Sequence, residues 1–184
     1  MSPNPQTFPI TLAGIPRELR LFEIKPGLKI AILNILGDTE LVEACAKTLL
    51  NKLGSIEFDL LVTAETKSIP LAHSMAVHAN KPYIILRKSY KIYMGKAIQV
   101  ETLSITTGAP QTLILDEKDS QTIQGKRVVI VDDVISTGST LDAMHKLMDI
   151  AGAKVVAEAA ICTEGDNAKW EKIMHLGELP LFCD

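Results

Sequence analysis

One segment limits what this chain can fold into more than any other, namely residues 128–140, which read VVIVDDVISTGST. Its apolar run shows no alternation with polar residues, so both faces of the predicted strand should be covered, as in a parallel sheet flanked by helices. Asp132 and Asp133 follow the run. Ligands bind at this carboxyl end of the strands in open α/β sheets. The segment therefore predicts a central strand that leads into a binding site.

A loop of small hydroxyl residues and glycine follows the two acids, and apolar residues at helical spacing follow the loop. Ser139 and Asp142 have the spacing of a capping box at the start of that helix. Gly138 lets the backbone approach a ligand closely. Hydroxyl groups and free backbone N–H groups at a helix start suit a phosphate. The two carboxylates would then face sugar hydroxyls or a metal ion.

A second loop, residues 65–70 with the sequence ETKSIP, lies between a predicted buried strand at 58–64 and a helix that begins near Pro70. Because it also follows a strand, it should reach the same edge of the sheet as the acidic loop. Lys67 provides a cation among hydroxyl groups, which suits a second phosphate or a pyrophosphate. The two loops together predict one cleft with two anion sites.

The rest of the chain alternates between strand and helix patterns, which is typical of βαβ units. Residues 1–29 are interrupted by prolines and predict an irregular arm with at most one strand. The segment 97–115 predicts a hairpin inserted before the central strand. The apolar tail at 178–182 is expected to close the core. The other expected elements are strands at 28–33, 83–86 and 154–162, and helices at 39–53, 70–79, 141–151 and 168–176.

Composition narrows the class of protein. The 184 residues, 47% of them hydrophobic, can bury the core of one ordinary domain, so we expect a single domain over 1–184. The net charge of −3 and the absence of a Lys/Arg block disfavour nucleic-acid binding. No apolar stretch is long enough to span a bilayer and no signal peptide is visible, so a cytoplasmic protein is expected. No metal-ligand or disulfide spacing is found among the histidines and cysteines, which are His73, His78, His145, His175, Cys45, Cys162 and Cys183.

Three segments resemble those of one family. Residues 128–140 resemble the phosphoribosyl-diphosphate (PRPP) signature of type I phosphoribosyltransferases, a hydrophobic strand, two acids and then Thr-Gly-x-Thr. Residues 63–72, TAETKSIPLA, are similar to the pyrophosphate-binding loop of that family, although Ser68 stands where Gly is usual, which leaves the backbone geometry of this loop open. Residues 87–95 resemble the R-K-x-x-K-x-x-x-G segment that begins the flexible catalytic loop of adenine phosphoribosyltransferases.

The resemblance implies an α/β fold with a central, mainly parallel sheet flanked by helices, an inserted flexible hairpin loop, a core at about 28–165 and a small hood from about 1–27 and 166–184. It implies a purine phosphoribosyltransferase of nucleotide salvage, with adenine favoured, that works as a homodimer with Mg²⁺ held by PRPP and water. The implied catalytic residues are Asp132 and Asp133, which would bind the ribose hydroxyls. The 5′-phosphate would lie on Ser136, Thr137, Gly138, Ser139 and Thr140, the pyrophosphate on Thr66, Lys67 and Ser68, and the flexible loop would carry Arg87, Lys88 and Lys91.

Other interpretations stay open at this point. Purine-responsive repressors share the PRPP motif without catalysis, but they carry a further N-terminal DNA-binding domain and a basic face, neither of which is expected here. An orotate-type enzyme shares the loop around Lys67. A dinucleotide-binding domain would need a G-x-G-x-x-G turn. Adenine enzymes carry a catalytic glutamate in a Tyr-x-Leu-Glu-Tyr-Gly stretch, and Glu101 is near that region without a clear match. Trp170 and Phe182 could line a base pocket or pack in the core.

Overall fold

The centre of the protein is a five-stranded parallel sheet. The structure, a computed structural model, describes residues 6–103 and 110–183. The strand order is β10 (Gly177–Leu179), β9 (Lys154–Glu164), β8 (Arg127–Ile135), β4 (Leu60–Ala64) and β5 (Tyr83–Leu86). The apolar run of residues 128–131 lies in β8, the middle strand, so the predicted parallel α/β fold is confirmed.

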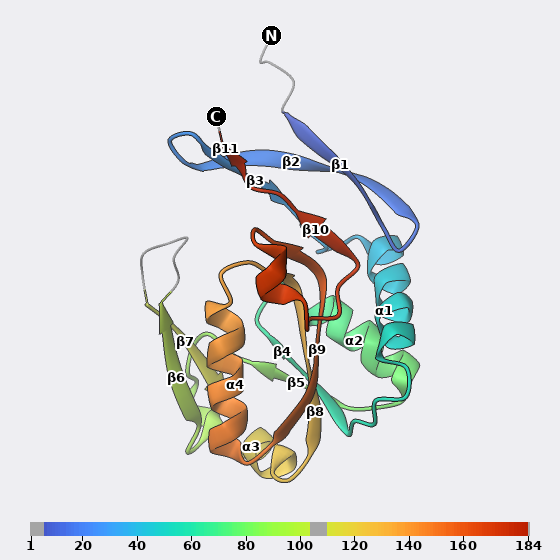
Figure 1. The fold of residues 1–184 in the computed structure, drawn as a ribbon. Helices are drawn as coiled ribbons and strands as arrows, with labels where there is room; N and C mark the ends of the chain where they lie inside the picture. The colour runs from blue at the N-terminus through green and yellow to red at the C-terminus, as the bar shows by residue number, and fades with distance from the viewer. Residues whose placement is uncertain (1–5, 104–109, 184) are drawn as a thin grey trace.

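Helices cover both faces of this sheet (Figure 1). Helices α1 (Thr39–Leu53) and α2 (Ile69–Ala79) lie on one face, and α4 (Ser139–Ala151) lies on the other. A short helix, α3 (Glu117–Ile123), precedes β8. Side chains of β8 alternate between two cores, with Val129 and Val131 in the core of α1 and α2, and Val128 and Ile130 in the core of α4. This burial on both faces is the reason that the strand sequence is apolar throughout.

Most helix ends follow the sequence expectations, but two predictions were wrong. Helix α1 covers the expected range 39–53, with Asp38 as its cap and Gly54 after its last residue. The expected capping box of Ser139 is absent, because Gly138 is the cap of α4 and Ser139 is already helical. The helix expected at 168–176 is reduced to the 3₁₀ helix η2 (Asn167–Trp170), because the chain beyond it extends to pair with β9 as strand β10.

The N-terminal segment is a hairpin and not the predicted irregular arm. Strands β1 (Thr7–Leu12) and β2 (Ile15–Lys25) pair with each other and join β3 (Leu28–Ile32) and β11 (Phe182–Cys183) in a second, four-stranded sheet. Pro9 lies in the edge strand β1 and Pro16 near the start of β2, positions where a strand tolerates a missing N–H. Figure 1 shows this sheet, which we call the hood, above the central sheet.

The hairpin predicted before the central strand is confirmed as β6 (Ile98–Leu103) and β7 (Pro110–Leu115), although its expected turn at 106–110 lies largely outside the described residues. It follows a short 3₁₀ helix, η1 (Ile92–Met94). The hairpin lies beside α4 (Figure 1), where the Thr102 hydroxyl donates a hydrogen bond to the Ser139 carbonyl at 2.9 Å. This bond joins the hairpin to the loop that carries the predicted phosphate site.

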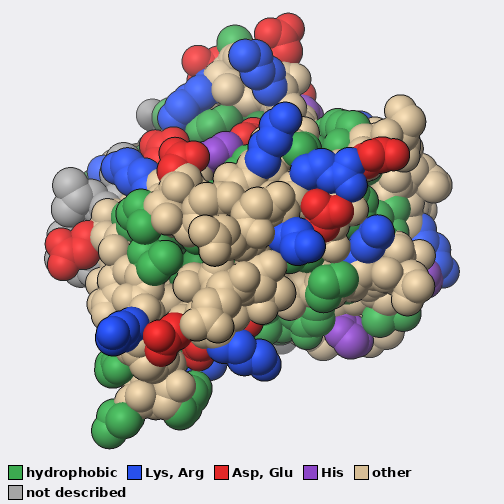
Figure 2. Space-filling view, turned by 90° about the horizontal axis from the view of Figure 1, so that it is seen from below, with side chains coloured by type: hydrophobic (Ala, Val, Ile, Leu, Met, Phe, Trp, Pro, Cys, Tyr) green, Lys and Arg blue, Asp and Glu red, His purple; other side chains and the backbone are tan. Residues whose placement is uncertain are grey.

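The outer surface carries charges of both signs. Figure 2 shows the face opposite the hood, where basic and acidic side chains are interspersed and form no broad patch of one sign among the residues drawn in colour. Within the described ranges, no helix is both long and apolar enough to cross a bilayer.

Candidate functional site

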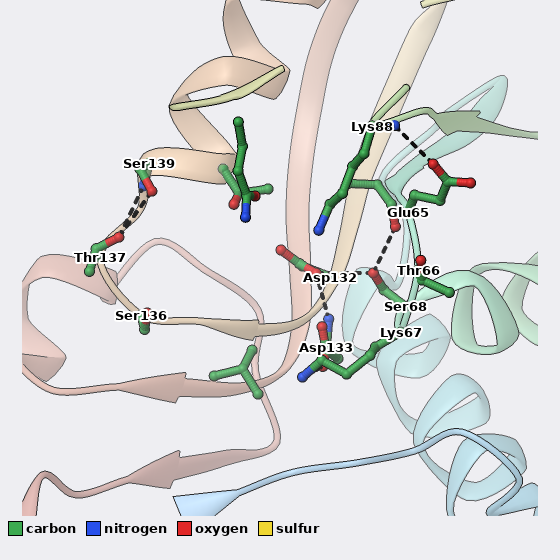
Figure 3. A pocket seen from close by; sticks show the side chains of 14 residues that line it. Glu65, Thr66, Lys67, Ser68, Lys88, Asp132, Asp133, Ser136, Thr137 and Ser139 are labelled. Atoms are coloured by element: carbon green, nitrogen blue, oxygen red, sulfur yellow. Dashed lines mark hydrogen bonds and ion pairs between the residues drawn. The ribbon is translucent and has the colours of Figure 1, made fainter. Parts of the chain in front are cut away.

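A cavity of about 360 Å³ lies where β4 and β8 lead into their loops, between the two loops predicted to bind anions. Figure 3 shows its lining residues. Gly138 lies in a small depression next to this cavity. Arg87 and Lys91 line neither. The lining residues are Ala64, Glu65, Thr66, Lys67, Ser68, Lys88, Gln111, Asp132, Asp133, Val134, Ser136, Thr137, Ser139 and Thr140.

The two aspartates lie within β8, which continues to Ile135, and not after the strand as the sequence suggested. Asp132 is half-buried, and its Oδ1 accepts hydrogen bonds from the Ser68 hydroxyl at 3.0 Å and from the Asp133 N–H at 2.9 Å. Burial and the adjacent Asp133 raise the pKa of Asp132 well above the usual range of an aspartate. Asp132 is therefore protonated more easily than an aspartate in water.

Asp133 is almost completely buried, and Lys67 from the other loop lies beside it. Lys67 Nζ is 2.8 Å from Asp133 Oδ2 and 3.4 Å from the carbonyl oxygen of Leu33. Among the described residues, Asp133 Oδ2 has no hydrogen bond of good geometry, so the ammonium group of Lys67 is its close partner. The predicted cation of the loop before α2 thus pairs with a carboxylate of strand β8 (Figure 3).

The loop before α2 turns one of its hydroxyl groups inward. The peptide bond between Glu65 and Thr66 is cis. The Ser68 side chain is buried and directed to Asp132, with the Ala64 carbonyl 3.3 Å away as an alternative acceptor. A ligand in the cavity would therefore meet Thr66 and the backbone of this loop more readily than the Ser68 hydroxyl.

The loop before α4 makes a tight turn at Gly138. Gly138 has a φ of +86°, a backbone conformation that residues with a Cβ atom rarely adopt. The hydroxyl groups of Thr137 and Ser139 lie 3.1 Å apart. Ser139 opens α4, so the unpaired N–H groups and the positive end of this 13-residue helix lie at the cavity wall. This arrangement favours a dianionic group.

The basic residues after β5 take three different positions. The Lys88 side chain reaches the cavity (Figure 3). Arg87 is directed instead to Glu65, whose carboxylate accepts hydrogen bonds from Arg87 Nε and from the Lys88 N–H, both at 2.8 Å. These contacts, the Lys88 N–H first, lower the pKa of Glu65. Lys91 is exposed at the start of η1, and Glu101 is exposed on β6 opposite Thr112.

A second cavity, of about 290 Å³, lies under the hood and shares Ser136 and Thr137 with the first. The sequence named Trp170 as a possible lining residue of a base pocket, but it did not identify the other lining residues, because they come from segments that are far apart in the chain. Trp170 lines it, whereas Phe182 packs against Phe8 in the hood with ring centroids 5.5 Å apart. The other lining residues are Ile24, Lys25, Leu28, Ile30, Glu164, Gly165, Asp166, Lys169 and Leu181.

Gln111 and Lys169 were also missed as lining residues of the two cavities. Neither lies in a motif, so no local signal in the sequence could have identified them. The four histidines line neither cavity; His78 pairs with Glu43 and His145 with Glu158. Within the described residues, no group of three or more His, Cys, Asp and Glu side chains could hold a metal ion.

Comparison with known proteins identifies relatives of this chain. A family model described as the phosphoribosyl transferase domain matches residues 32–176. The chain is 32% identical over 147 residues to adenine phosphoribosyltransferase from Thermosipho africanus, a match that covers 77% of this chain and 84% of that enzyme. It is 31% identical over 141 residues to the purine biosynthesis transcriptional repressor PurR of Bacillus subtilis, covering 74% of this chain and 49% of the repressor.

The chain thus spans about half the length of the repressor. It is also 31% identical to a hypoxanthine/guanine phosphoribosyltransferase from Methanothrix soehngenii, a match that covers 64% of this chain and 59% of that enzyme. Among solved structures, adenine phosphoribosyltransferase from Thermoanaerobacter pseudethanolicus superposes with a TM-score of 0.72 at 23% identity, over 87% of this chain and 95% of that one. This structural likeness establishes a common fold.

Proposed function

The chain belongs to the phosphoribosyl transferase domain family, and from this premise we propose that it transfers the 5-phosphoribosyl group of PRPP to a purine base, adenine favoured, in nucleotide salvage. The observation that carries the proposal is one cavity with an anion-binding loop on either side of two aspartates, joined at Ser136 and Thr137 to a largely apolar second cavity. A sugar with phosphate at one end and pyrophosphate at the other fits the first, and a flat base fits the second.

The 5′-phosphate would lie on the loop Ser136–Thr140. Its oxygens would accept hydrogen bonds from the backbone N–H groups at the start of α4 and from the hydroxyl groups of Thr137 and Ser139, which are already close together. Gly138 allows the turn with its positive φ. A phosphate here would hold the ribose near the second cavity, which shares Ser136 and Thr137 with the first.

Asp132 and Asp133 would act on the ribose. The reaction breaks the bond between C1′ and a pyrophosphate oxygen and forms a bond between C1′ and a ring nitrogen of the base, which loses its proton. Positive charge develops on the ribose as the first bond breaks, and carboxylates fixed beside it stabilise that charge. Asp132 is held by Ser68 and by the Asp133 N–H, so it would accept the ribose hydroxyls without reorganisation.

The pyrophosphate would lie between Thr66, Lys67, Ser68 and Lys88. Two lysines at the cavity offset part of its charge, and the N–H groups of the loop before α2 would donate to its oxygens. The donor set suits Mg²⁺, because Asp132 offers hard oxygen atoms in a cavity wide enough for water and phosphate, the ligands that this ion prefers. When bound, Mg²⁺ would neutralise charge on the leaving pyrophosphate.

The base would lie under the hood, against Trp170 and the apolar residues Ile24, Leu28, Ile30 and Leu181. An indole ring and aliphatic side chains suit a flat heterocycle. The hairpin β6–β7 and the segment with Arg87, Lys88 and Lys91 would then close over the first cavity and exclude water. Glu65 holds the start of that segment through hydrogen bonds from Arg87 Nε and the Lys88 N–H.

The proposal includes a cytoplasmic homodimer. Large apolar side chains are exposed next to the flexible segment, with Ile92 at 93% and Tyr93 at 72% of their full exposure. An exposed group of this kind is typical of a protein interface. Sedimentation analysis of the purified chain tests this part, and a monomer at micromolar concentration would contradict it.

One assay tests the reaction: release of pyrophosphate from PRPP and Mg²⁺ in the presence of adenine, hypoxanthine, guanine, xanthine or orotate. We expect release with adenine, with formation of AMP. Release with orotate alone would favour a pyrimidine enzyme.

A second candidate function is PRPP sensing without catalysis, since the repressor PurR is among the relatives and shares 31% identity. In that case PRPP would bind to the protein, as measured by calorimetry, but no base would cause pyrophosphate release. The two lysines at the first cavity lie outside the shared PRPP motif and suit a leaving pyrophosphate, so they favour the enzyme.

A further inference from the structure

Two adjacent side chains of the short helix η2, Lys169 and Trp170, line the second cavity and also contact the loop at residues 136–140, which borders the first. Lys169 Nζ donates a hydrogen bond of 2.6 Å to the carbonyl oxygen of Thr137, in the middle of the loop at residues 136–140. The same ammonium group lies 4.4 Å from the centroid of the Trp170 ring. Both side chains also line the cavity under the hood. Helix η2 therefore forms part of the wall of the second cavity and also holds the loop that borders the first.

The contact between Trp170 and Gly138 is equally close. A methyl group on Gly138 would lie 2.6 Å from Cη2 of the indole and 3.5 Å from Lys169 Nζ. Trp170 is buried, and its Nε1 donates to the Glu164 carbonyl at 3.3 Å, so the ring has little freedom to move away. A shift of Gly138 or Thr137 must therefore be accompanied by a shift of η2, since packed side chains and a charged hydrogen bond join them.

We propose that Lys169 is a positioning residue that couples the two cavities, so that an anion on the loop 136–140 strengthens the binding of a base under the hood, and the reverse. The inference rests on the proposed function, because it assumes that these two cavities hold the phosphorylated sugar and the base. A phosphate would fix the Thr137 carbonyl in place, and Lys169 and Trp170 would then be held in the position that the base needs. Such coupling is reciprocal by thermodynamic necessity.

Lys169 suits this role better than direct binding of phosphate. Its ammonium group is directed to a backbone carbonyl of the loop, and it lines the second cavity but not the first. Because its side chain is exposed, the loss of this bond should leave the fold intact. Its removal should thus lower the coupling between the two binding events, and the affinity for each ligand alone serves as a separate measure of each site.

The test measures binding with ligands that cannot react. Calorimetry gives the dissociation constant of ribose 5-phosphate with and without saturating adenine, and the ratio of the two is the coupling factor. In the wild-type protein we expect adenine to tighten ribose 5-phosphate binding roughly tenfold, the size expected for a charged hydrogen bond. In Lys169→Met the ratio should fall to about one, and in Lys169→Arg, which can still donate to the carbonyl, most of it should return.

Lys172→Met is the matched control, because Lys172 is an exposed lysine just beyond η2 and lines neither cavity. It should keep the wild-type ratio. A wild-type ratio in Lys169→Met, with both ligands bound, would overturn the inference and leave the proposed function standing. If neither ligand binds to the wild-type protein, the proposed function fails and this inference fails with it.

Discussion

Lys67 Nζ lies 2.8 Å from Asp133 Oδ2, so the loop before α2 and the strand β8 meet through one ion pair inside the cavity. Asp133 is buried, whereas the Lys67 side chain is 47% exposed and can leave the pair to meet a ligand. In the proposed reaction Lys67 would turn to the pyrophosphate, and Asp133 would become free to offset positive charge on the ribose.

This pair gives the first prediction. Asp133→Asn keeps the shape and removes the charge, so turnover should fall at least about tenfold, equivalent to ~1.4 kcal/mol of transition-state stabilisation. Steady-state kinetics of pyrophosphate release would measure it. Asp149→Asn, at the exposed end of α4, is the control and should behave like the wild type. Full activity with unchanged PRPP affinity in Asp133→Asn would remove Asp133 from the mechanism.

The raised pKa of Asp132 predicts a pH-dependent stability. Because burial and Asp133 raise this pKa in the folded state, the folded protein loses stability as the pH rises from the usual aspartate pKa through the raised one. At pH 8 the free energy of unfolding of Asp132→Asn should therefore exceed that of the wild type by about 1 kcal/mol, which thermal unfolding would show as a higher midpoint. Near pH 3 the Asp132 carboxyl group is protonated and as neutral as the asparagine that replaces it, so the two proteins should have similar stability.

Activity should move in the opposite direction. Asparagine can still accept the hydrogen bonds from Ser68 and from the Asp133 N–H, so the site should keep its shape. The charge for the ribose would be gone, and turnover should fall while stability rises. A variant that is both fully active and more stable would contradict the role given to Asp132.

The contact between Gly138 and Trp170 predicts an unusually costly substitution. Gly138→Ala combines a φ of +86° with a methyl group 2.6 Å from the indole. Gly125→Ala is the matched control, since Gly125 has a φ of +70° with nothing within 4 Å of the added carbon. We expect the control to cost about 1–2 kcal/mol from its backbone alone, and Gly138→Ala to cost about 1–3 kcal/mol more.

Chemical denaturation of the two glycine variants measures this difference. Ribose 5-phosphate binding should also weaken in Gly138→Ala and stay near the wild-type value in Gly125→Ala, which lies far from the loop before α4. Equal losses of stability in both variants would show that the indole gives way without cost.

Ion pairs of Arg17 with Asp38 and Glu40 should help to hold the hood on the core, beside the apolar packing of Leu12 and Leu19. Arg17 on β2 contacts Asp38, the cap of α1, through its Nε at 2.8 Å and its Nη2 at 2.9 Å. This pairing is the main cause that lowers the pKa of Asp38. Arg17→Met should cost about 1 kcal/mol of unfolding free energy at neutral pH, while Arg20→Met, at an exposed position of the same strand, should cost less.

The pH dependence of this loss follows from the lowered pKa. The stabilisation is complete above the unfolded-state pKa of an aspartate and disappears as the pH falls through the lower, folded-state value. Thermal unfolding of Arg17→Met and the wild type should therefore differ at pH 7 and converge in strong acid. A constant difference across this range would mean that Arg17 stabilises the hood by packing alone.

Local patterns were sufficient for most of the core. The apolar run before Asp132 predicted a covered central strand because burial on both faces leaves no room for polar alternation. The apolar spacing predicted the range of α1, and the structure places Asp38 and Gly54 at its ends, where unpaired backbone groups need partners or a turn. The positions of Lys67 and the acids at one sheet edge followed from topology, since parallel strands joined by helices bring their following loops together.

Other features depended on contacts between distant segments, which no local pattern contains. The hood joins strands from both ends of the chain, as the pairing of Phe182 with Lys29 shows, so the prolines near the N-terminus were mistaken for a sign of irregular structure. The inward turn of the Ser68 hydroxyl depends on Asp132, 64 residues away. Lys169 was an ordinary exposed lysine until the fold brought it to the Thr137 carbonyl. Propensity and periodicity describe how a segment meets a generic core or solvent, whereas a hydrogen bond between distant residues exists only once the whole chain has folded.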